Sequence, residues 1–130
     1  PGEAARLLGW EMGRVLADRF GTAQALAEKL GCTALLKGDV TLLARQDASG
    51  PRFALSANGA PALAKGGSGD VLCGMLAALR PGRTHWEATA LACVWHGLAG
   101  RAGEARYGQL ELTSAQLIAC LHAARTGERK

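Results

Sequence analysis

Three glycines stand within four residues, Gly66-Gly67-Ser68-Gly69, and lead through Asp70 into an uncharged apolar stretch, 71–79. The apolar stretch predicts a buried helix, and the glycines predict a tight turn before it, because a residue without Cβ lets the backbone turn sharply. Such a turn directs backbone N–H groups to a helix N-terminus, where the peptide dipoles add positive potential. The segment therefore fits a cradle for a phosphate group, with Asp70 as a candidate base.

The same segment also has a purely structural interpretation. Glycine-rich turns commonly end one element and begin the next. Asp70 would then be an N-cap or first-turn acid that stabilises the helix by about 0.5–2 kcal/mol without chemistry. The segment is neither a P-loop nor a G-x-G-x-x-G fingerprint, because no Lys-Ser or Lys-Thr follows the last glycine and the glycine spacing differs. On the pattern alone, both interpretations stay open.

Composition is that of an ordinary globular chain. The 130 residues are enough for one domain with a core, 48% of them are hydrophobic and 20% are charged. The 18 glycines favour a loop-rich α/β fold over a helical bundle. The net charge of +4 is dispersed, without the basic and aromatic stripe of a nucleic-acid-binding protein, and it suits a polyanionic small molecule.

The cysteines indicate the compartment. There are four, and no two of them form a C-x-x-C pair: Cys32, Cys73, Cys93 and Cys120. Each lies in or beside an apolar run, so we expect buried free thiols and a reducing compartment such as the cytoplasm. No histidine stands at metal-ligand spacing from them, and we expect no metal site made by the protein alone. We expect neither a signal peptide nor a membrane span.

Hydrophobic periodicity predicts about three strands and five or six helices. The predicted helices cover 2–8, 11–19, 22–30, 71–79, 84–102 and 113–125, and the predicted strands cover 33–37, 40–44 and 52–56, the last two as a hairpin. Thr22 is the expected N-cap of the third helix and Gly31 its end. Thr84-x-x-Glu87 and Thr113-x-x-Gln116 are capping boxes for the last two helices. The end of the chain, 126–130, is expected to fray.

Two of these helices are apolar nearly all round, and 88–99 is expected to be buried over most of its circumference. About three strands are too few to cover them. We therefore expect either an oligomer or a further part of the chain that completes the sheet. The first residues, Pro1-Gly2-Glu3, are typical of the middle of a turn-to-helix junction, which favours a fragment.

Four segments, in order, resemble one family, the ADP/ATP-dependent NAD(P)H-hydrate dehydratases of the ribokinase-like superfamily. Pro1-Gly2-Glu3 is similar to its His-Pro-Gly-Glu segment, and Lys37-Gly38-Asp39-Val40-Thr41 to its Lys-Gly-x-x-Thr loop. Residues 59–72 are similar to its Gly-Gly-Thr/Ser-Gly-Asp-Val-Leu core, although 60–64 read Ala-Pro-Ala-Leu-Ala where the family often has Asn-Pro-Gly-Met-Ala. The fourth segment is His96–Gly100 with the later Leu112-Thr113. Together they cover nearly the whole chain.

The resemblance implies an α/β fold of ribokinase-like three-layer architecture, in which residues 1–130 form the C-terminal part of one domain. It implies that the phosphates and adenine side of ADP or ATP contact Lys37, Gly38, Asp39, Val40, Thr41 and Gly69. The anion hole over the transferring phosphate would be Gly66, Gly67, Ser68 and Gly69. Asp70 would bind the substrate hydroxyl and act as its base. A magnesium ion would be carried by the nucleotide phosphates.

The implied reaction phosphorylates the hydroxyl of NAD(P)H hydrate and then eliminates phosphate to restore NADH or NADPH. The chain is expected to be inactive alone, or to associate with a missing N-terminal part of the domain or with further copies. One alternative is a vitamin or sugar kinase of the same superfamily, which shares the Gly-x-Gly-Asp ending. The other is a non-catalytic nucleotide-binding module. His96 is expected to be a core or interface histidine, and Lys65 a solvated loop lysine.

Overall fold

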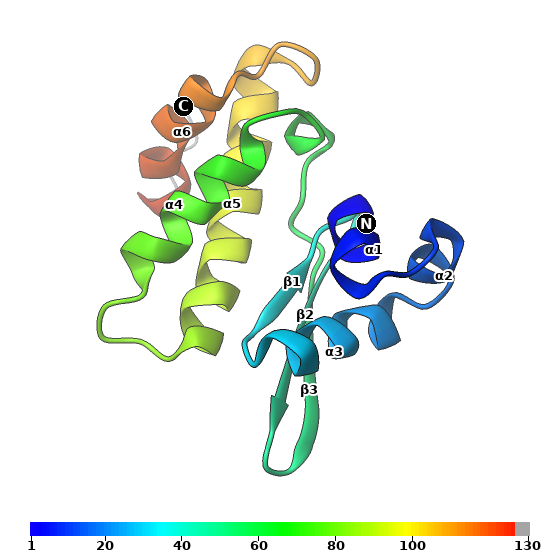
Figure 1. The fold of residues 1–130 in the computed structure, drawn as a ribbon. Helices are drawn as coiled ribbons and strands as arrows, with labels where there is room; N and C mark the ends of the chain where they lie inside the picture. The colour runs from blue at the N-terminus through cyan, green and yellow to red at the C-terminus, as the bar shows by residue number, and fades with distance from the viewer. Residues whose placement is uncertain (127–130) are drawn as a thin grey trace. The chain divides into compact units, whose positions relative to one another are not determined.

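The computed structural model describes residues 1–126, and the chain divides into two compact units, Pro1–Ser56 and Ala57–Lys130 (Figure 1). The described part contains six α-helices and three strands, which confirms the predicted α/β class and element numbers. Within this part, no helix combines the length and apolar character needed to cross a membrane. Of the end of the chain expected to fray, 126–130, Thr126 is the last residue of a helix, and 127–130 lie outside the described residues.

The first unit combines three helices with an antiparallel sheet of strand order β1-β2-β3. Its elements are α1 (Gly2–Leu8), α2 (Met12–Ala17), α3 (Arg19–Leu30), β1 (Ala34–Leu36), β2 (Thr41–Asp47) and β3 (Gly50–Ser56). The predicted hairpin is confirmed, with Thr41 opposite Ser56 and Asp47 opposite Gly50. Helix α3 packs on β1 and β2, and alanines and leucines from these three elements make most of the core of this unit.

The junction between α2 and α3 corrects two predictions. A helix over 11–19 and a second from Thr22 are both wrong, because α2 ends at Ala17 and α3 begins at Arg19. Asp18 is the N-cap, and its carboxylate accepts the N–H of Gly21 at 2.8 Å. Thr22 lies buried inside α3, where its hydroxyl donates to the carbonyl of Asp18 at 2.7 Å. The helix begins here because the Asp18 carboxylate accepts a hydrogen bond from an amide three residues later.

The second unit is a short 3₁₀-helix, η1 (Pro61–Leu63), followed by α4 (Ser68–Leu79), α5 (His85–Tyr107) and α6 (Ser114–Thr126), which pack together (Figure 1). Both capping boxes are confirmed. Thr84 Oγ1 accepts the N–H of Glu87 at 3.2 Å, and the Glu87 carboxylate accepts the N–H of Thr84 at 2.9 Å. These bonds from Thr84 lower the pKa of the Glu87 carboxyl. Gln116 and Thr113 make the same exchange at the start of α6.

Burial on α5 confirms the sequence expectation, and burial at the cysteines confirms it in part. Of residues 88–99, seven are buried, and the exposed ones are Leu91, Val94 and Leu98 at 37–41%. The buried stripe of α5 consists mostly of small residues, with His96 among them. Cys93 and Cys120 are buried free thiols as expected, but Cys32 and Cys73 are exposed.

The buried stripe of α5 includes three glycines at a spacing of three residues, Gly97, Gly100 and Gly103. A Cβ on Gly97 would collide with the backbone oxygen of Asn58. A Cβ on Gly100 would lie 2.6 Å from Leu63 Cδ1, and one on Gly103 would lie 2.6 Å from Leu112 Cδ1. The absence of side chains at these positions lets segment 58–63 and Leu112 lie directly against the helix.

We predict that Gly97→Ala destabilises the protein by about 1–3 kcal/mol, because the new methyl group meets backbone that cannot rotate away. Gly74→Ala on α4 is the matched control. That glycine is also helical, but it is exposed, and apart from the neighbouring backbone of α4 no atom lies within 4 Å of the place that a methyl group would take, so alanine should stabilise the helix by up to about 1 kcal/mol. Urea unfolding of both variants measures the difference. Equal tolerance of the two would contradict the close approach at Gly97.

Candidate functional site

The glycine segment folds as the turn that starts α4. Gly67 is the N-cap with φ +85°, and Ser68, Gly69 and Asp70 form the first turn of the helix. The helix thus begins three residues before the predicted Val71. L-residues with side chains rarely adopt this positive φ, and a Cβ on Gly67 would also collide with the hydroxyl of Ser114. The positive φ is therefore the main reason for glycine at position 67, and the nearby hydroxyl of Ser114, which can rotate, is a lesser one.

The start of α4 presents backbone donors. The first backbone bond into the turn runs from the N–H of Val71 to the carbonyl of Gly67 at 3.2 Å, so the amides of Ser68, Gly69 and Asp70 precede the first intrahelical donor. Gly67 has no side chain that would cap them. Three N–H groups at the positive end of a helix dipole can bind an anion. The Asp70 carboxylate is exposed beside them and makes no side-chain hydrogen bond or ion pair within residues 1–126.

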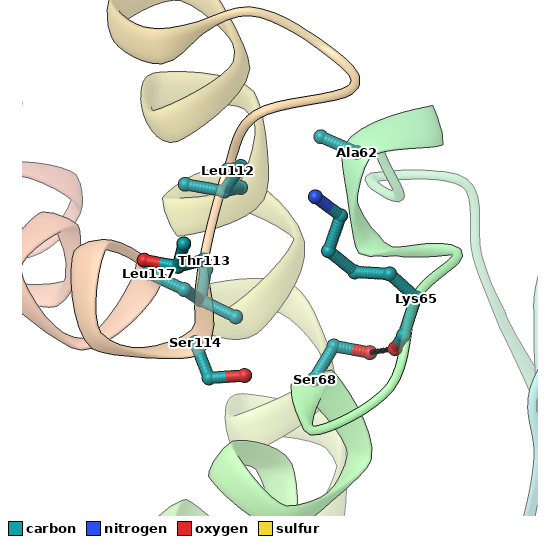
Figure 2. Close-up of a pocket in the computed structure, with 7 residues that line it drawn as sticks. All are labelled: Ala62, Lys65, Ser68, Leu112, Thr113, Ser114 and Leu117. Atoms are coloured by element: carbon teal, nitrogen blue, oxygen red, sulfur yellow. Dashed lines mark hydrogen bonds between the residues drawn. The ribbon is translucent and has the colours of Figure 1, made fainter.

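Ser68 contributes to this turn in a way that the sequence did not indicate. Its side chain is buried, and its hydroxyl lies 2.7 Å from the carbonyl oxygen of Leu63 and 3.1 Å from that of Lys65 (Figure 2 draws the latter). A hydroxyl has one hydrogen, and these two carbonyls share it. Of the two donors on Ser68, the backbone N–H is therefore the one left to an anion, and the side chain fixes the shape of the turn.

His96 confirms the expectation of a buried histidine and has a defined partner. Its Nε2 lies 2.9 Å from the backbone carbonyl oxygen of Ser68. Because a carbonyl only accepts, Nε2 carries the hydrogen and donates it. The bond ties α5 to the first residue of α4, directly under the glycine turn.

Lys65 is exposed, as expected of a loop lysine, but its ammonium donates to the carbonyl of Leu110 at 2.9 Å. Figure 2 shows its side chain running towards Ala62 and Leu112, away from Ser114. It borders a small pocket of about 150 Å³, which includes space open to solvent and is lined by Ala62, Lys65, Ser68, Leu112, Thr113, Ser114 and Leu117. The lysine therefore joins the glycine turn to the segment before α6.

The second group of candidate residues, Lys37 to Thr41, consists of the connection from β1 to β2 in the first unit and the first residue of β2. Lys37 follows the last residue of β1, and the first three residues of the group are exposed, whereas Val40 and Thr41 are half-buried. This connection has a partner that sequence reasoning missed. Arg19 Nη2 donates to the carbonyl of Leu36 at 3.3 Å and to that of Val40 at 2.6 Å. The sequence offered no signal for this contact, because Arg19 was predicted to end a helix, where a cation is favourable, and the structure places it at the start of α3.

The two groups of candidate residues lie in different units, and each is held by contacts within its own unit. Among residues 1–126 there is no group of three or more His, Cys, Asp or Glu side chains arranged to hold a metal ion.

We predict that His96→Ala destabilises the protein by about 2–4 kcal/mol, because it removes a buried ring and its hydrogen bond to Ser68. His96→Gln should cost clearly less, since the glutamine amide nitrogen is placed much like Nε2 and donates to the same carbonyl. Urea unfolding compares the two variants. Equal losses would show that the ring's volume, and not the bond to Ser68, is what matters.

Comparison with known proteins places the chain in a family. A family model described as NAD(P)H-hydrate dehydratase matches residues 1–122. The bifunctional NAD(P)H-hydrate repair enzyme Nnr of Escherichia coli is 37% identical over 123 residues, which are 93% of this chain and 23% of that protein. The enzymes of the same name from Thermofilum pendens and Methanopyrus kandleri are 40% and 38% identical, over 90% and 83% of this chain and 22% and 21% of their own lengths.

The chain thus spans about a fifth of the length of the curated relatives that it matches. The match includes both the glycine turn at α4 and the connection from Lys37 to Thr41. The resemblance inferred from the motifs is confirmed: this chain belongs to the NAD(P)H-hydrate dehydratase family.

Proposed function

We propose that this chain takes part in the nucleotide-dependent dehydration of NAD(P)H hydrate, with the start of α4 as the site of phosphoryl transfer. The observation that supports this most is the exposed Asp70 carboxylate in the first turn of α4, beside amides that no N-cap side chain occupies. Phosphoryl transfer needs donors for the charge on the phosphate and a carboxylate within reach of the attacking oxygen, and this turn offers both.

In the proposed first step, the Asp70 carboxylate accepts the proton of the hydrate hydroxyl while that oxygen attacks the terminal phosphorus of ADP or ATP. A new O–P bond forms, and the bridging P–O bond of the nucleotide breaks with its electron pair on the departing nucleotide. The amides of Gly66 to Gly69 stabilise the charge on the transferring group. Phosphate then leaves with the electrons of the C–O bond, and loss of a proton restores the ring of NADH or NADPH.

Lys37, Gly38, Asp39, Val40 and Thr41 are proposed to contact the phosphates and adenine side of the nucleotide, together with Gly69. The exposure of Lys37 at the end of β1 supports this role, because its ammonium is accessible to a polyphosphate. A magnesium ion bound to the nucleotide would neutralise part of the phosphate charge. The chain's own contribution is to orient the nucleotide and to supply the ammonium of Lys37.

We further propose that the reaction takes place in the cytoplasm, since all four cysteines are free thiols and two of them are exposed. The exposed apolar residues of α5 support the expected association with a further copy or with another part of the domain.

We predict that Asp70→Asn lowers the rate of NADH recovery from NADH hydrate by about 10²–10⁴-fold and leaves nucleotide affinity within about threefold, because an amide cannot take the proton. The measurement is a coupled assay with ADP or ATP on the full product of the gene that encodes this chain. Glu111→Gln is the matched control, since it makes the same change at an exposed carboxylate of the same unit.

The products of the same assay separate the alternative functions. A stable phosphorylated product without NADH recovery would support a small-molecule kinase. Nucleotide binding without any turnover would support a non-catalytic module. Full activity of Asp70→Asn would exclude this carboxylate as the base.

A further inference from the structure

The guanidinium of Arg19 bridges the two ends of the Lys37–Thr41 connection. Both of its bonds come from Nη2, one to the carbonyl of Leu36 at 3.3 Å and one to that of Val40 at 2.6 Å. Leu36 is the last residue of β1, and Val40 directly precedes β2. The arginine therefore holds both ends of a short exposed turn whose middle is Lys37, Gly38 and Asp39.

Arg19 stands where helix energetics do not favour it. It is the first residue of α3, next to the N-cap Asp18, and a positive charge at that end opposes the helix dipole by roughly 0.3–1 kcal/mol. Its side chain is half-buried in the first unit. Charge-assisted hydrogen bonds to two carbonyls offset this cost, since a bond to a charged group is about twice as strong as a neutral one.

The missing side chain of Gly38 leaves room for the guanidinium of Arg19. A Cβ on Gly38 would lie 2.7 Å from Arg19 Nη2 and 3.1 Å from Cζ. The φ of Gly38 is not in the positive region, so the backbone conformation alone does not require glycine. What glycine provides here is space for the guanidinium against the turn.

We propose that Arg19 is a positioning residue of the nucleotide site. By fixing the carbonyls on both sides of Lys37, Gly38 and Asp39, its guanidinium holds the turn in the shape that presents Lys37 and the backbone to the nucleotide phosphates. The inference rests on the proposed function, because it takes this turn as part of the nucleotide site. It assigns to Arg19 a role in nucleotide affinity and not in the chemistry at Asp70.

Arg19→Gln and Arg19→Lys test this in the full product of the gene, with Arg6→Gln as the control, since Arg6 is an exposed arginine of the same unit. We expect Arg19→Gln to raise the KM and Kd for ADP or ATP about tenfold, with kcat and the KM for NADH hydrate changed less than twofold. The nucleotide KM and Kd of Arg19→Lys should lie between those of the wild type and of Arg19→Gln, since an ammonium keeps the positive charge but lacks the planar array of donors of a guanidinium. A role in folding alone would lower the melting temperature and the active fraction and leave the nucleotide KM unchanged.

A double-mutant cycle with Gly38→Ala tests the contact directly. We expect Gly38→Ala to weaken nucleotide binding at least fivefold when Arg19 is present and clearly less in Arg19→Gln, because the new methyl group then has no guanidinium to displace. The inference would be overturned if the effects of the two substitutions on nucleotide Kd were additive, or if Arg19→Gln left that Kd unchanged. Nucleotide binding by the wild-type protein would in both cases leave the proposed function intact. Absence of nucleotide binding by the wild-type protein would overturn both.

Discussion

The close approach of backbone to helix α5 is the constraint on which the second unit depends. Gly97 leaves room for the carbonyl of Asn58, and Gly100 leaves room for Leu63. The carbonyl of Leu63 is in turn an acceptor for the buried hydroxyl of Ser68, at the first residue of α4. The position of the glycine turn therefore follows from the missing side chains on a helix that is distant from it in sequence. Glycines inside a helix cost about 1 kcal/mol each relative to alanine, and packing against the preceding loop offsets that cost.

Polar side chains of α5 strengthen the same contact. Arg101 donates to the carbonyl of Ala57 at 3.2 Å, and the Glu104 carboxylate accepts the N–H of Ala62 at 3.0 Å. With the bond from His96 to Ser68, three residues within about two turns of α5 hold the segment that leads into α4 and the first residue of α4. The segment itself has little regular structure, only η1, so α5 supports its conformation together with the bonds of the Ser68 hydroxyl to Leu63 and Lys65. A rigid support of this kind is what a cradle of backbone amides needs, because the amides cannot be repositioned by side-chain rotation.

The sequence predicted those features that depend on local interactions. Gly31, with φ +61°, ends α3, and the two capping boxes start α5 and α6, because each signal lies within four residues of the structure it creates.

The boundary at Asp18 was missed because Thr22 was an equally good local cap, and only the buried position of Thr22 decides between them. Arg19 was missed for a similar reason. Its partners are 17 and 21 residues away, across a strand, and no local pattern records that contact. The candidate nucleotide and anion-binding residues came from motif order, which carries no information on what holds them in place.

Three side chains of α5 make hydrogen bonds to the segment before α4 and to its first residue: His96, Arg101 and Glu104. For these bonds, the number of residues in α5 matters as much as their identity. One added residue rotates everything after it by about 100° and moves it by about 1.5 Å along the axis. An insertion between His96 and Gly100 would leave the bond to Ser68 in place and turn Gly100, Arg101 and Glu104 away from the segment that they support. Side chains on the exposed face, such as Leu91 and Val94, have no such restriction. We therefore expect the middle of α5 to tolerate substitutions on its exposed face but no insertion or deletion.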